Sequence, residues 1–517
     1  MNNSTKMLIM FLLIILIFAY YSYMTPKTSV VQNTTGDSLK VDKVDTTSKK
    51  IETLQQKSPE SYILPKDTSL FYFETDLLKG KISSLSGSFS SLILKNYKTR
   101  KGDSLELLND GQKLFKLIVK SRNIVLDFSN INFFPVYIGD INPLKNDVDS
   151  LVLMGFFDTI RVTRTFIFRK GSYLITQKIG SNIPLDKKEY ILEKGISFTE
   201  DNISDELQYY GVSYHSFNNI YRIKEKNVKN ISNYSGTYDW MGVQTKYFFA
   251  GIIGKGDNIQ VKKLEDKKLE TQFSILSDSV EFYVGPIDYR ILKQLKNGMD
   301  KLPDFGWSWI QPISKLILSF LIFMYGFIPN YGVIIILLSI LFIIIFSPLT
   351  FTSFSSMRKM QMIQPQLEEL KKKYAKDPQK LNTETMNLYK KSGINPFMGC
   401  LPLLIQMPIF FALYAILRTT IELRQAPFAF WIKDLSYKDP FYVLPVLTGI
   451  TMFISQKISS TATDESQKML VYIMPVMITI LFLNMPSGIN LYWFIYNILS
   501  VGQQILIKNS IKKQMGE

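Results

Sequence analysis

The fold class of this chain is indicated first by the segment Tyr331-Gly-Val-Ile-Ile-Ile-Leu-Leu-Ser-Ile-Leu-Phe-Ile-Ile-Ile-Phe346, which Ser347-Pro348 follows. It contains no charged residue, and most of its side chains are Ile, Leu, Val or Phe. With its flank up to residue 350, the run is long enough to cross a bilayer as a helix. The mean hydropathy of the 517-residue chain is only +0.06, because the apolar residues are concentrated in blocks. The stretch therefore predicts a membrane protein.

Five further apolar blocks predict more membrane-spanning helices, which makes six in all. They are Met7–Tyr23, Leu401–Leu417, Phe441–Ile454, Leu470–Met485 and Ile489–Ile507. The first block ends in an aromatic run without a small-residue cleavage pattern, so residues 1–24 are predicted to be an uncleaved N-terminal anchor. Residues 301–330 contain an apolar run interrupted by Lys315, which predicts an amphipathic helix at the membrane interface.

Basic residues separate the predicted second span, 331–350, from the predicted third to sixth spans within 400–508. Residues 351–399 hold nine lysines and arginines against four acidic residues and show the periodicity of a helical hairpin. Short loops rich in lysine and arginine stay in the cytoplasm. The hairpin and the basic tail, 509–517, are therefore predicted to be cytoplasmic. Six spans then place the N-terminus in the cytoplasm and the region before the second span outside.

Residues 67–300 form a separate domain, which follows a polar linker at 25–66. Ile160, Val162, Phe166 and Phe168 alternate with polar side chains, and this period of two predicts a half-buried strand. Similar runs occur at Leu70–Thr75, Phe89–Leu94, Leu114–Val119, Ile124–Phe128 and Val280–Val284. Many short strands with turn residues between them predict a β-sandwich. No apolar run in this domain is long enough to span a bilayer, so it is predicted to be soluble.

The composition excludes several function classes. The formal net charge of +16 has no nucleic-acid-binding motif beside it, so we expect anionic membrane surfaces as its counterpart and no direct nucleic-acid specificity. One cysteine, Cys400, and one histidine, His215, exclude a disulfide framework and a His-rich zinc site. We expect His215 to lie on the surface or in a turn. No nucleotide-binding, nucleophile or metalloprotease motif is present, so neither an enzyme nor a cofactor is predicted.

Polar side chains follow one face of the last predicted span. Their spacing of i, i+3, i+7, i+10 and i+14 places five of them in a single stripe: Asn490, Trp493, Asn497, Ser500 and Gln504. Ser339 and Gln406 add polar groups in other spans. The stripe is consistent with hydrogen bonds between helices or with a hydrated cavity in the bilayer. The spans lack a central charged residue, which argues against an ion-coupled transporter.

The hairpin begins with a methionine-rich, basic sequence. It contains Met357, Arg358, Met360 and Met362. One interpretation is a solvated connection between two spans. The other is a platform that contacts apolar segments or anionic lipid, because methionine surfaces adapt to varied partners.

Several long motifs resemble those of the YidC/Oxa family. Asn395–Phe410, Asn-Pro-Phe-Met-Gly-Cys-Leu-Pro-Leu-Leu-Ile-Gln-Met-Pro-Ile-Phe, is similar to a signature of that family. Further similar runs, in the family's order, are Glu422–Phe428, Trp431–Ser436, Lys457–Thr463, Pro486–Gly488 and Leu491–Trp493. The resemblance covers about residues 331–513, and Asp239–Ala250 and Val284–Pro286 agree with the family's outer domain.

The resemblance implies a membrane protein insertase and chaperone in a bacterial inner membrane. It implies a polytopic α-helical protein with six transmembrane helices, a five-helix insertase core, and a large periplasmic β-sandwich of the supersandwich type. Implied partners are nascent membrane proteins, the Sec translocon, the ribosome, the signal recognition particle receptor and anionic lipids. The alternatives are a chaperone that acts only with Sec, a channel or transporter, and a sugar-binding role for the outer domain.

The resemblance also implies a polar groove that accepts the client. Candidate groove residues are Ser339, Ile343, Gln406, Asn490, Tyr492, Trp493, Asn497, Ser500 and Gln504. The family commonly has an arginine five residues before the proline of the second span, and Ile343 occupies that position here. We therefore predict that insertion depends less on the charge of the client than it does in arginine-bearing relatives.

Overall fold

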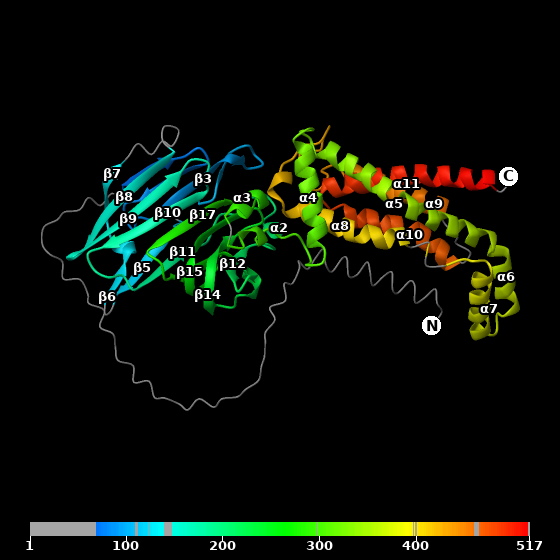
Figure 1. Cartoon of the computed structure of the whole chain (residues 1–517), viewed down its shortest axis with the longest axis horizontal. Helices are drawn as coiled ribbons and strands as arrows, with labels where there is room; N and C mark the ends of the chain where they lie inside the picture. Colours follow the sequence, from blue (N-terminus) through cyan, green and yellow to red (C-terminus); the bar gives the residue numbers. More distant parts are fainter. Residues whose placement is uncertain are drawn as a thin grey trace, which may run out of the picture. The chain divides into compact units, whose positions relative to one another are not determined.

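The computed structural model describes residues 69–108, 112–121, 124–138, 147–295, 297–395, 398, 401–459 and 465–514. The predicted anchor and linker lie outside these residues. The described residues fall into two compact units. The β unit belongs to Lys27–Pro286 with Asn297–Met299, and the helical unit belongs to Ile287–Lys296 with Asp300–Glu517. Figure 1 shows the strands of the first and the long helices of the second.

The β unit contains two antiparallel sheets. The four-stranded sheet has the order β1-β2-β3-β4, with β1 (Leu70–Glu74), β2 (Leu78–Ser83), β3 (Phe89–Lys98) and β4 (Ser104–Glu106). The 13-stranded sheet has the main order β6-β5-β11-β16-β15-β17-β10-β9-β8-β7, and β14 joins β12 and β13 to β15. Its strands are β5 (Lys116–Ser121), β6 (Ile124–Asp127), β7 (Phe133–Ile138), β8 (Val148–Phe157), β9 (Ile160–Arg169), β10 (Leu174–Ser181), β11 (Lys187–Leu192), β12 (Gly211–Ser216), β13 (Asn219–Lys224), β14 (Ile231–Gln244), β15 (Phe248–Lys263), β16 (Leu269–Ile275) and β17 (Ser279–Pro286). The unit is β-rich, as the alternating pattern predicts.

Strand β9 shows why alternation is an incomplete guide to the core. Val162, Phe166 and Phe168 are buried, as their shared parity predicts. Arg164 has the same parity and is also fully buried. Its guanidinium donates hydrogen bonds to the carbonyl oxygens of Ser86, at 2.7 Å, and Phe115, at 3.1 Å. Burial lowers the pKa of Arg164 to about 10. The buried charge is tolerated because backbone acceptors meet it.

His215 is not a surface or turn residue, so that expectation is wrong. It lies on β12 and is only 5% exposed. Its Nδ1 lies 2.8 Å from an oxygen of Asp239, and its ring stacks on Trp240 with 5.9 Å between centroids. The pairing of β12 with β14 places His215 opposite Trp240. A contact across strands determines its burial, and the polar sequence around His215 does not show this contact.

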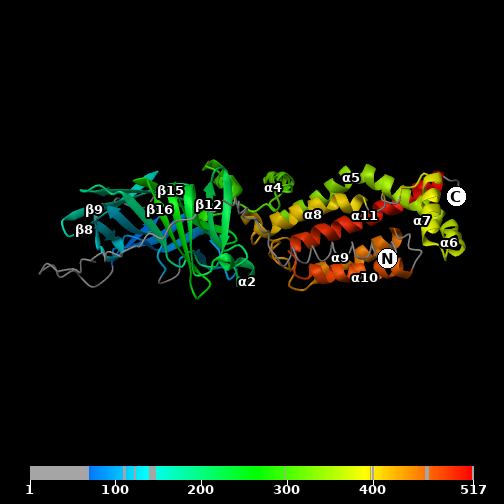
Figure 2. The same ribbon diagram turned by 90° about the horizontal axis from the view of Figure 1, so that it is seen from below.

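The helical unit contains nine α-helices in the described residues. They are α3 (Tyr289–Gln294), α4 (Gln311–Tyr325), α5 (Tyr331–Met362), α6 (Gln364–Lys373), α7 (Pro378–Lys391), α8 (Leu401–Thr419), α9 (Val443–Ser459), α10 (Glu465–Phe482) and α11 (Ser487–Gln514). Helix α11 contacts α5, α8 and α9, and α10 packs on α9, as Figure 2 shows. Among the described residues, α5 is the one helix that is long and apolar enough to cross a membrane by length and composition. Shorter apolar helices occur at Gln311–Tyr325, Leu404–Thr419, Val443–Ile458 and Tyr472–Phe482.

Helix α5 continues past Ser347-Pro348, where the apolar run ends. It begins at the cap of Asn330, whose side chain accepts hydrogen bonds from two backbone N–H groups, and it continues through Pro348 to Met362. A proline inside a helix removes one backbone hydrogen bond, which can bend the helix without ending it. The methionine-rich segment therefore lies on the extension of α5. The hairpin itself consists of α6 and α7, and Asp377 caps the start of α7.

Candidate functional site

The N-terminal part of the polar stripe on α11 is hydrogen-bonded to the turn that precedes the helix. We use the name α11 stripe for Asn490, Trp493, Asn497, Ser500 and Gln504. Asn490 is fully buried, and its amide nitrogen donates to the carbonyl oxygens of Phe482, at 3.2 Å, and Met485, at 3.4 Å. The backbone oxygen of Asn490 accepts a hydrogen bond of 3.3 Å from Thr448 on α9. The amide nitrogen and backbone oxygen of Asn490 thus join α9, α10 and α11, whereas its side-chain oxygen is buried without a partner among the described residues.

Tyr492 joins three helices next to the stripe. It is fully buried, and its hydroxyl accepts a hydrogen bond from the side-chain amide of Gln406 on α8. Ser339 on α5 is also fully buried, and its hydroxyl donates to the carbonyl oxygen of Ile335 at 2.8 Å. The same hydroxyl lies 3.5 Å from the backbone oxygen of Tyr492. These polar side chains therefore lie together where α5, α8 and α11 meet.

The middle of the stripe leaves donors without partners. The ring of Trp493 contacts Phe410 and Phe482 edge-on, with centroids 5.1 and 5.7 Å away. Its indole nitrogen is buried and has no hydrogen-bond partner among the described residues. The side-chain nitrogen of Asn497, one turn further along α11, is also buried and has no hydrogen-bond partner in the described part of the chain. Because a buried donor without a partner costs about 1–3 kcal/mol, water or a polar client group at this place would be stabilised.

The C-terminal part of the stripe lies where side-chain hydrogen bonds join α11 to neighbouring helices. The side-chain nitrogen of Gln504 donates to the hydroxyls of Ser455 on α9, at 2.9 Å, and Ser500, at 3.3 Å. Gln503, which the sequence analysis missed, donates to Ser347 on α5 at 2.9 Å. Gln503 lies outside the stripe's spacing, so helical periodicity alone could not single it out. Polar groups therefore follow α11 from its start to the level of the α5 extension.

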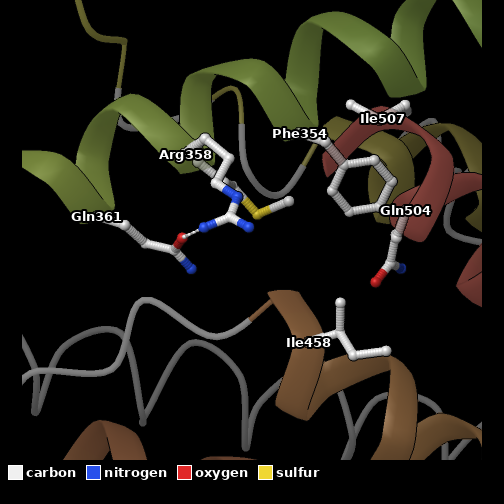
Figure 3. Close-up of a pocket in the computed structure, with 7 residues that line it drawn as sticks. Phe354, Arg358, Gln361, Ile458, Gln504 and Ile507 are labelled. Carbon is white, nitrogen blue, oxygen red and sulfur yellow. Dashed lines mark hydrogen bonds between the residues drawn. The ribbon is translucent and has the colours of Figure 1, made fainter. Parts of the chain in front are cut away.

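An open pocket lies at this end of the unit, between α5, α9 and α11 (Figure 3). Its empty volume is about 330 Å³, including space open to solvent. It is lined by Phe354, Met357, Arg358, Gln361, Ile458, Gln504 and Ile507. The guanidinium of Arg358 donates a 3.0 Å hydrogen bond to the side-chain oxygen of Gln361. Stripe residue Gln504 thus belongs to both the polar face and the pocket.

The structure separates the other candidate residues. Ile343 is half-buried on α5 and brings no cation to the stripe. Met357 lines the pocket, whereas Met360 packs against the small core of the hairpin, formed by Ile363, Leu367 and Ile394. Met362 is 62% exposed. The methionines therefore do not form one continuous surface.

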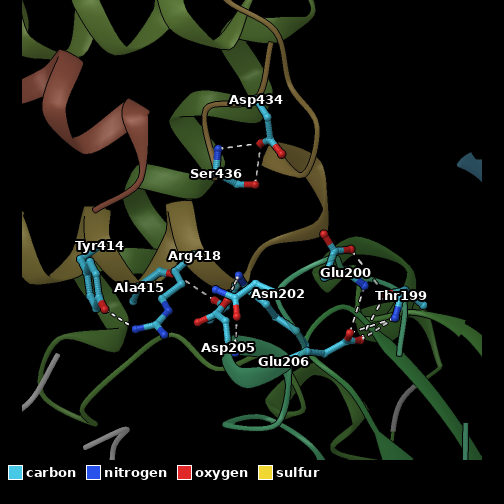
Figure 4. A network of polar contacts seen from close by, with 12 residues as sticks. Thr199, Glu200, Asn202, Asp205, Glu206, Tyr414, Ala415, Arg418, Asp434 and Ser436 are labelled. Carbon is cyan, nitrogen blue, oxygen red and sulfur yellow. Dashed lines mark hydrogen bonds and ion pairs between the residues drawn. The ribbon is translucent and has the colours of Figure 1, made fainter. Parts of the chain in front are cut away.

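The α8–α9 loop, residues 420–442, lies at the opposite end of the helical unit (Figure 1). Asp434 accepts hydrogen bonds from the N–H and hydroxyl of Ser436, at 2.9 and 2.7 Å, as Figure 4 shows. Asp439 is fully buried and accepts from the indole of Trp431 at 3.0 Å and from the N–H of Leu444 at 2.8 Å. The motif residues of this loop therefore fix its shape.

A buried carboxyl lies in the same loop. Burial, together with the charge of Asp288, raises the pKa of Glu422 to about 7, and Arg290 opposes this shift. The Nε of Arg290 is 4.0 Å from a Glu422 oxygen. Asp288 and Arg290 both lie on the segment that precedes α4, so the loop and this segment interact electrostatically.

Comparison with known proteins identifies the family. A family model described as 60Kd inner membrane protein matches residues 323–514, and one described as YidC periplasmic domain matches residues 71–319. The membrane protein insertase YidC of Syntrophus aciditrophicus is 33% identical over 84% of both chains, and that of Lawsonia intracellularis is 32% identical over 94% of both. The chain belongs to the YidC family of membrane protein insertases. The resemblance seen in the sequence is thereby confirmed.

Solved structures give weaker likenesses. A crystal structure described as an active YidC insertase with the first transmembrane domain resolved has a TM-score of 0.38 and 18% identity, and covers 84% of this chain and 92% of that one. A galactose mutarotase related enzyme from Lactobacillus acidophilus has a TM-score of 0.29 and 8% identity, and covers 42% of this chain and 97% of that one. Neither score is high enough to assign a function. The family relation rests on the sequence matches.

Proposed function

We propose that this YidC-family protein inserts and folds integral membrane proteins along the α11 stripe and its neighbours on α5 and α8. The observation that carries the proposal is the pair of unpartnered donors on Trp493 and Asn497, in the middle of a polar face. A purely structural stripe would be expected to pair these groups within the bundle. Their free hydrogen-bonding capacity suits a transient polar ligand or water.

The physical effect of such a path is a lower barrier for polar groups. Moving an amide or hydroxyl into hydrocarbon without a hydrogen bond costs several kcal/mol. A hydrated polar face that reaches part of the way across the bilayer shortens the distance over which a client's polar tail lacks water. The apolar segment of the client can then move from this face into the lipid.

The membrane topology is part of the proposal. We infer six spans, with the anchor within residues 1–24, then α5, α8, α9, α10 and α11. The nine basic residues between residues 351 and 399 support a cytoplasmic position for α6 and α7. The β unit is then periplasmic and of the supersandwich type, and the α8–α9 loop lies on the periplasmic side.

The proposed partners follow from this role. Nascent membrane proteins are the clients. By family analogy, the further partners are the Sec translocon, the ribosome, the signal recognition particle receptor and anionic lipids. A chaperone that works only with Sec remains the main alternative. No enzymatic step is needed for the proposed activity.

Reconstitution tests the proposal directly. Proteoliposomes that contain only this purified protein are given a single-span client with a short translocated tail, and insertion is scored by protease protection of the tail. Protection above that of empty liposomes supports an autonomous insertase. Absence of protection with folded protein, while an arginine-bearing relative is active in parallel, favours the Sec-dependent chaperone.

A deletion of residues 69–278 separates the two units. Insertion that survives this deletion assigns the activity to the helical unit. Loss of insertion, with the helices still integrated in the membrane, assigns a necessary part to the β unit and contradicts the proposal in its present form.

A further inference from the structure

Arg358 lies at the end of the α11 stripe, a position that its sequence register does not reveal. It is on the extension of α5, 15 residues after Ile343, which corresponds to about 22 Å along a helix. The structure brings it into the same pocket as Gln504, with Ile458 of α9 on the opposite wall (Figure 3). A cation is therefore present at the entrance of the proposed path, although none is present at Ile343.

The charge of Arg358 is not neutralised within the described part of the chain. The guanidinium donates to a neutral amide, that of Gln361, at 3.0 Å. In the described residues no carboxylate forms an ion pair with it. An arginine has five N–H donors in a planar fork, so most of them stay available for an incoming anion.

The walls of the pocket strengthen an interaction with an anion and restrict its nature. Phe354, Met357, Ile458 and Ile507 are apolar and exclude part of the water around the guanidinium. Attraction between opposite charges is stronger near such walls than in bulk water. An acidic side chain carried between apolar residues fits this combination, because the carboxylate meets Arg358 and its neighbours meet the apolar walls.

We infer that this pocket, which we call the Arg358 pocket, receives acidic residues of client polypeptides as they enter the α11 stripe. The inference rests on the proposed function. It favours a client over a lipid headgroup because Gln504, which lines the pocket, is hydrogen-bonded to Ser500 of the stripe. A ligand in the Arg358 pocket therefore lies next to Gln504 and Ser500, the nearest polar groups of the α11 stripe.

The inference locates the charge preference of this protein at the entrance rather than in the middle of the bilayer. An ion pair at this partly solvated place is weak, so the expected preference for acidic tails is modest. It is also sensitive to salt, because the screening length falls to about 3 Å at 1 M ionic strength.

The test compares clients that differ only in the charge of the translocated tail, with two Asp or two Asn. The full-length protein and its Arg358→Gln variant are reconstituted in phosphatidylcholine vesicles with and without phosphatidylglycerol. We expect the unchanged protein to insert the acidic client about fivefold better, the scale of a partly solvated ion pair. Arg358→Gln should reduce this ratio to about one. Arg358→Glu should instead favour a client whose tail carries two Lys over the client whose tail carries two Asp.

Lys359 provides the matched control. It is the next residue on the same helix and is exposed, so Lys359→Gln removes the same charge outside the pocket. This variant should keep the fivefold ratio. Arg358→Lys, which keeps the charge on a slightly shorter side chain, should keep most of it, and it supplies a folded variant if Arg358→Gln proves unstable.

Three outcomes would overturn the inference. The first is an equal loss of preference in Lys359→Gln and Arg358→Gln, which would indicate a general surface-charge effect. The second is a defect of Arg358→Gln that is the same for both tails and occurs only with phosphatidylglycerol, which would identify lipid phosphate as the ligand. The third is equal insertion of both tails by the unchanged protein. Insertion of neither tail would instead contradict the proposed function itself.

Discussion

In the α8–α9 loop, the buried carboxylate of Asp439 accepts hydrogen bonds from Trp431, Phe441 and Leu444 at 2.8–3.0 Å. In the α11 stripe, the buried nitrogens of Trp493 and Asn497 have no partner among the described residues. Both regions belong to the helical unit, and both place polar groups out of contact with solvent. The difference separates two uses of buried polarity. Fully paired groups fix a shape, whereas unpaired groups keep a capacity to bind something else.

The largest effect is expected from breaking the paired region. Asp439→Ala leaves three donors without their acceptor in a fully buried place. We expect a loss of about 3–5 kcal/mol of stability, because hydrogen bonds to a charged group are each worth about 1.5–3 kcal/mol and their losses overlap. Thermal unfolding in detergent measures this loss. The exposed Lys433→Ala in the same loop is the control, and an equal effect of both variants would contradict the argument.

The next effect concerns the pH dependence of the same end of the unit. The pKa of Glu422 is raised to about 7 by burial and by the charge of Asp288, with Arg290 acting in the opposite direction. The folded state therefore binds a proton that the unfolded state has released above its ordinary carboxyl pKa, so stability is present at pH 4–5 and falls as the pH rises through 7. We expect up to about 3 kcal/mol of this loss between pH 5 and 8.

Glu422→Gln should remove this part of the pH dependence. Unfolding midpoints of the two proteins measured at pH 5, 6, 7 and 8 give the comparison. A parallel pH profile in both proteins would show that Glu422 does not control it.

The unpaired region should respond in the opposite sense to substitution. Asn497→Leu replaces a buried, unpartnered amide by an apolar group of similar size, so stability should stay the same or rise by about 1 kcal/mol. Insertion of a client with a polar tail should nevertheless fall severalfold. Proteoliposome insertion and thermal unfolding are measured on the same preparations. Ile498→Ala, at the neighbouring exposed position, should leave insertion unchanged.

A loss of both stability and insertion in Asn497→Leu would show that Asn497 is structural. The difference between the α8–α9 loop and the α11 stripe would then disappear. An unchanged insertion rate would remove Asn497 from the proposed path.

The smallest expected effect comes from adding a charge to the path. Ile343→Arg places a cation on α5, and it should raise the preference for acidic tails by about threefold. The measurement is the ratio of insertion of acidic and neutral clients. No change in this ratio would count against the idea that the apolar side chain at residue 343 weakens the dependence on client charge.

Local patterns predicted much of this protein because they act through short-range physics. The apolar run at 331–346 predicted a helix, and alternation predicted β9. Both predictions work because the spacing of apolar residues along the chain determines which face of an element can be buried. The stripe spacing also placed Asn490, Trp493, Asn497, Ser500 and Gln504 on one face of α11. The apolar run ends at Ser347-Pro348, but α5 continues to Met362, because the neighbouring turns support a helix across a single proline.

The environment of each polar residue depends on contacts that form only in the folded chain. Sequence patterns alone predicted a membrane protein with a β-rich domain, a helical core and a basic hairpin, and long motifs indicated the family. They could not show that Arg164 and His215 are buried, that the side-chain nitrogen of Asn490 is paired while that of Asn497 is not, or that Arg358 shares a pocket with Gln504. These facts depend on contacts between residues far apart in the chain. Periodicity specifies which face of an element is buried, but the partner on that face exists only after the chain has folded.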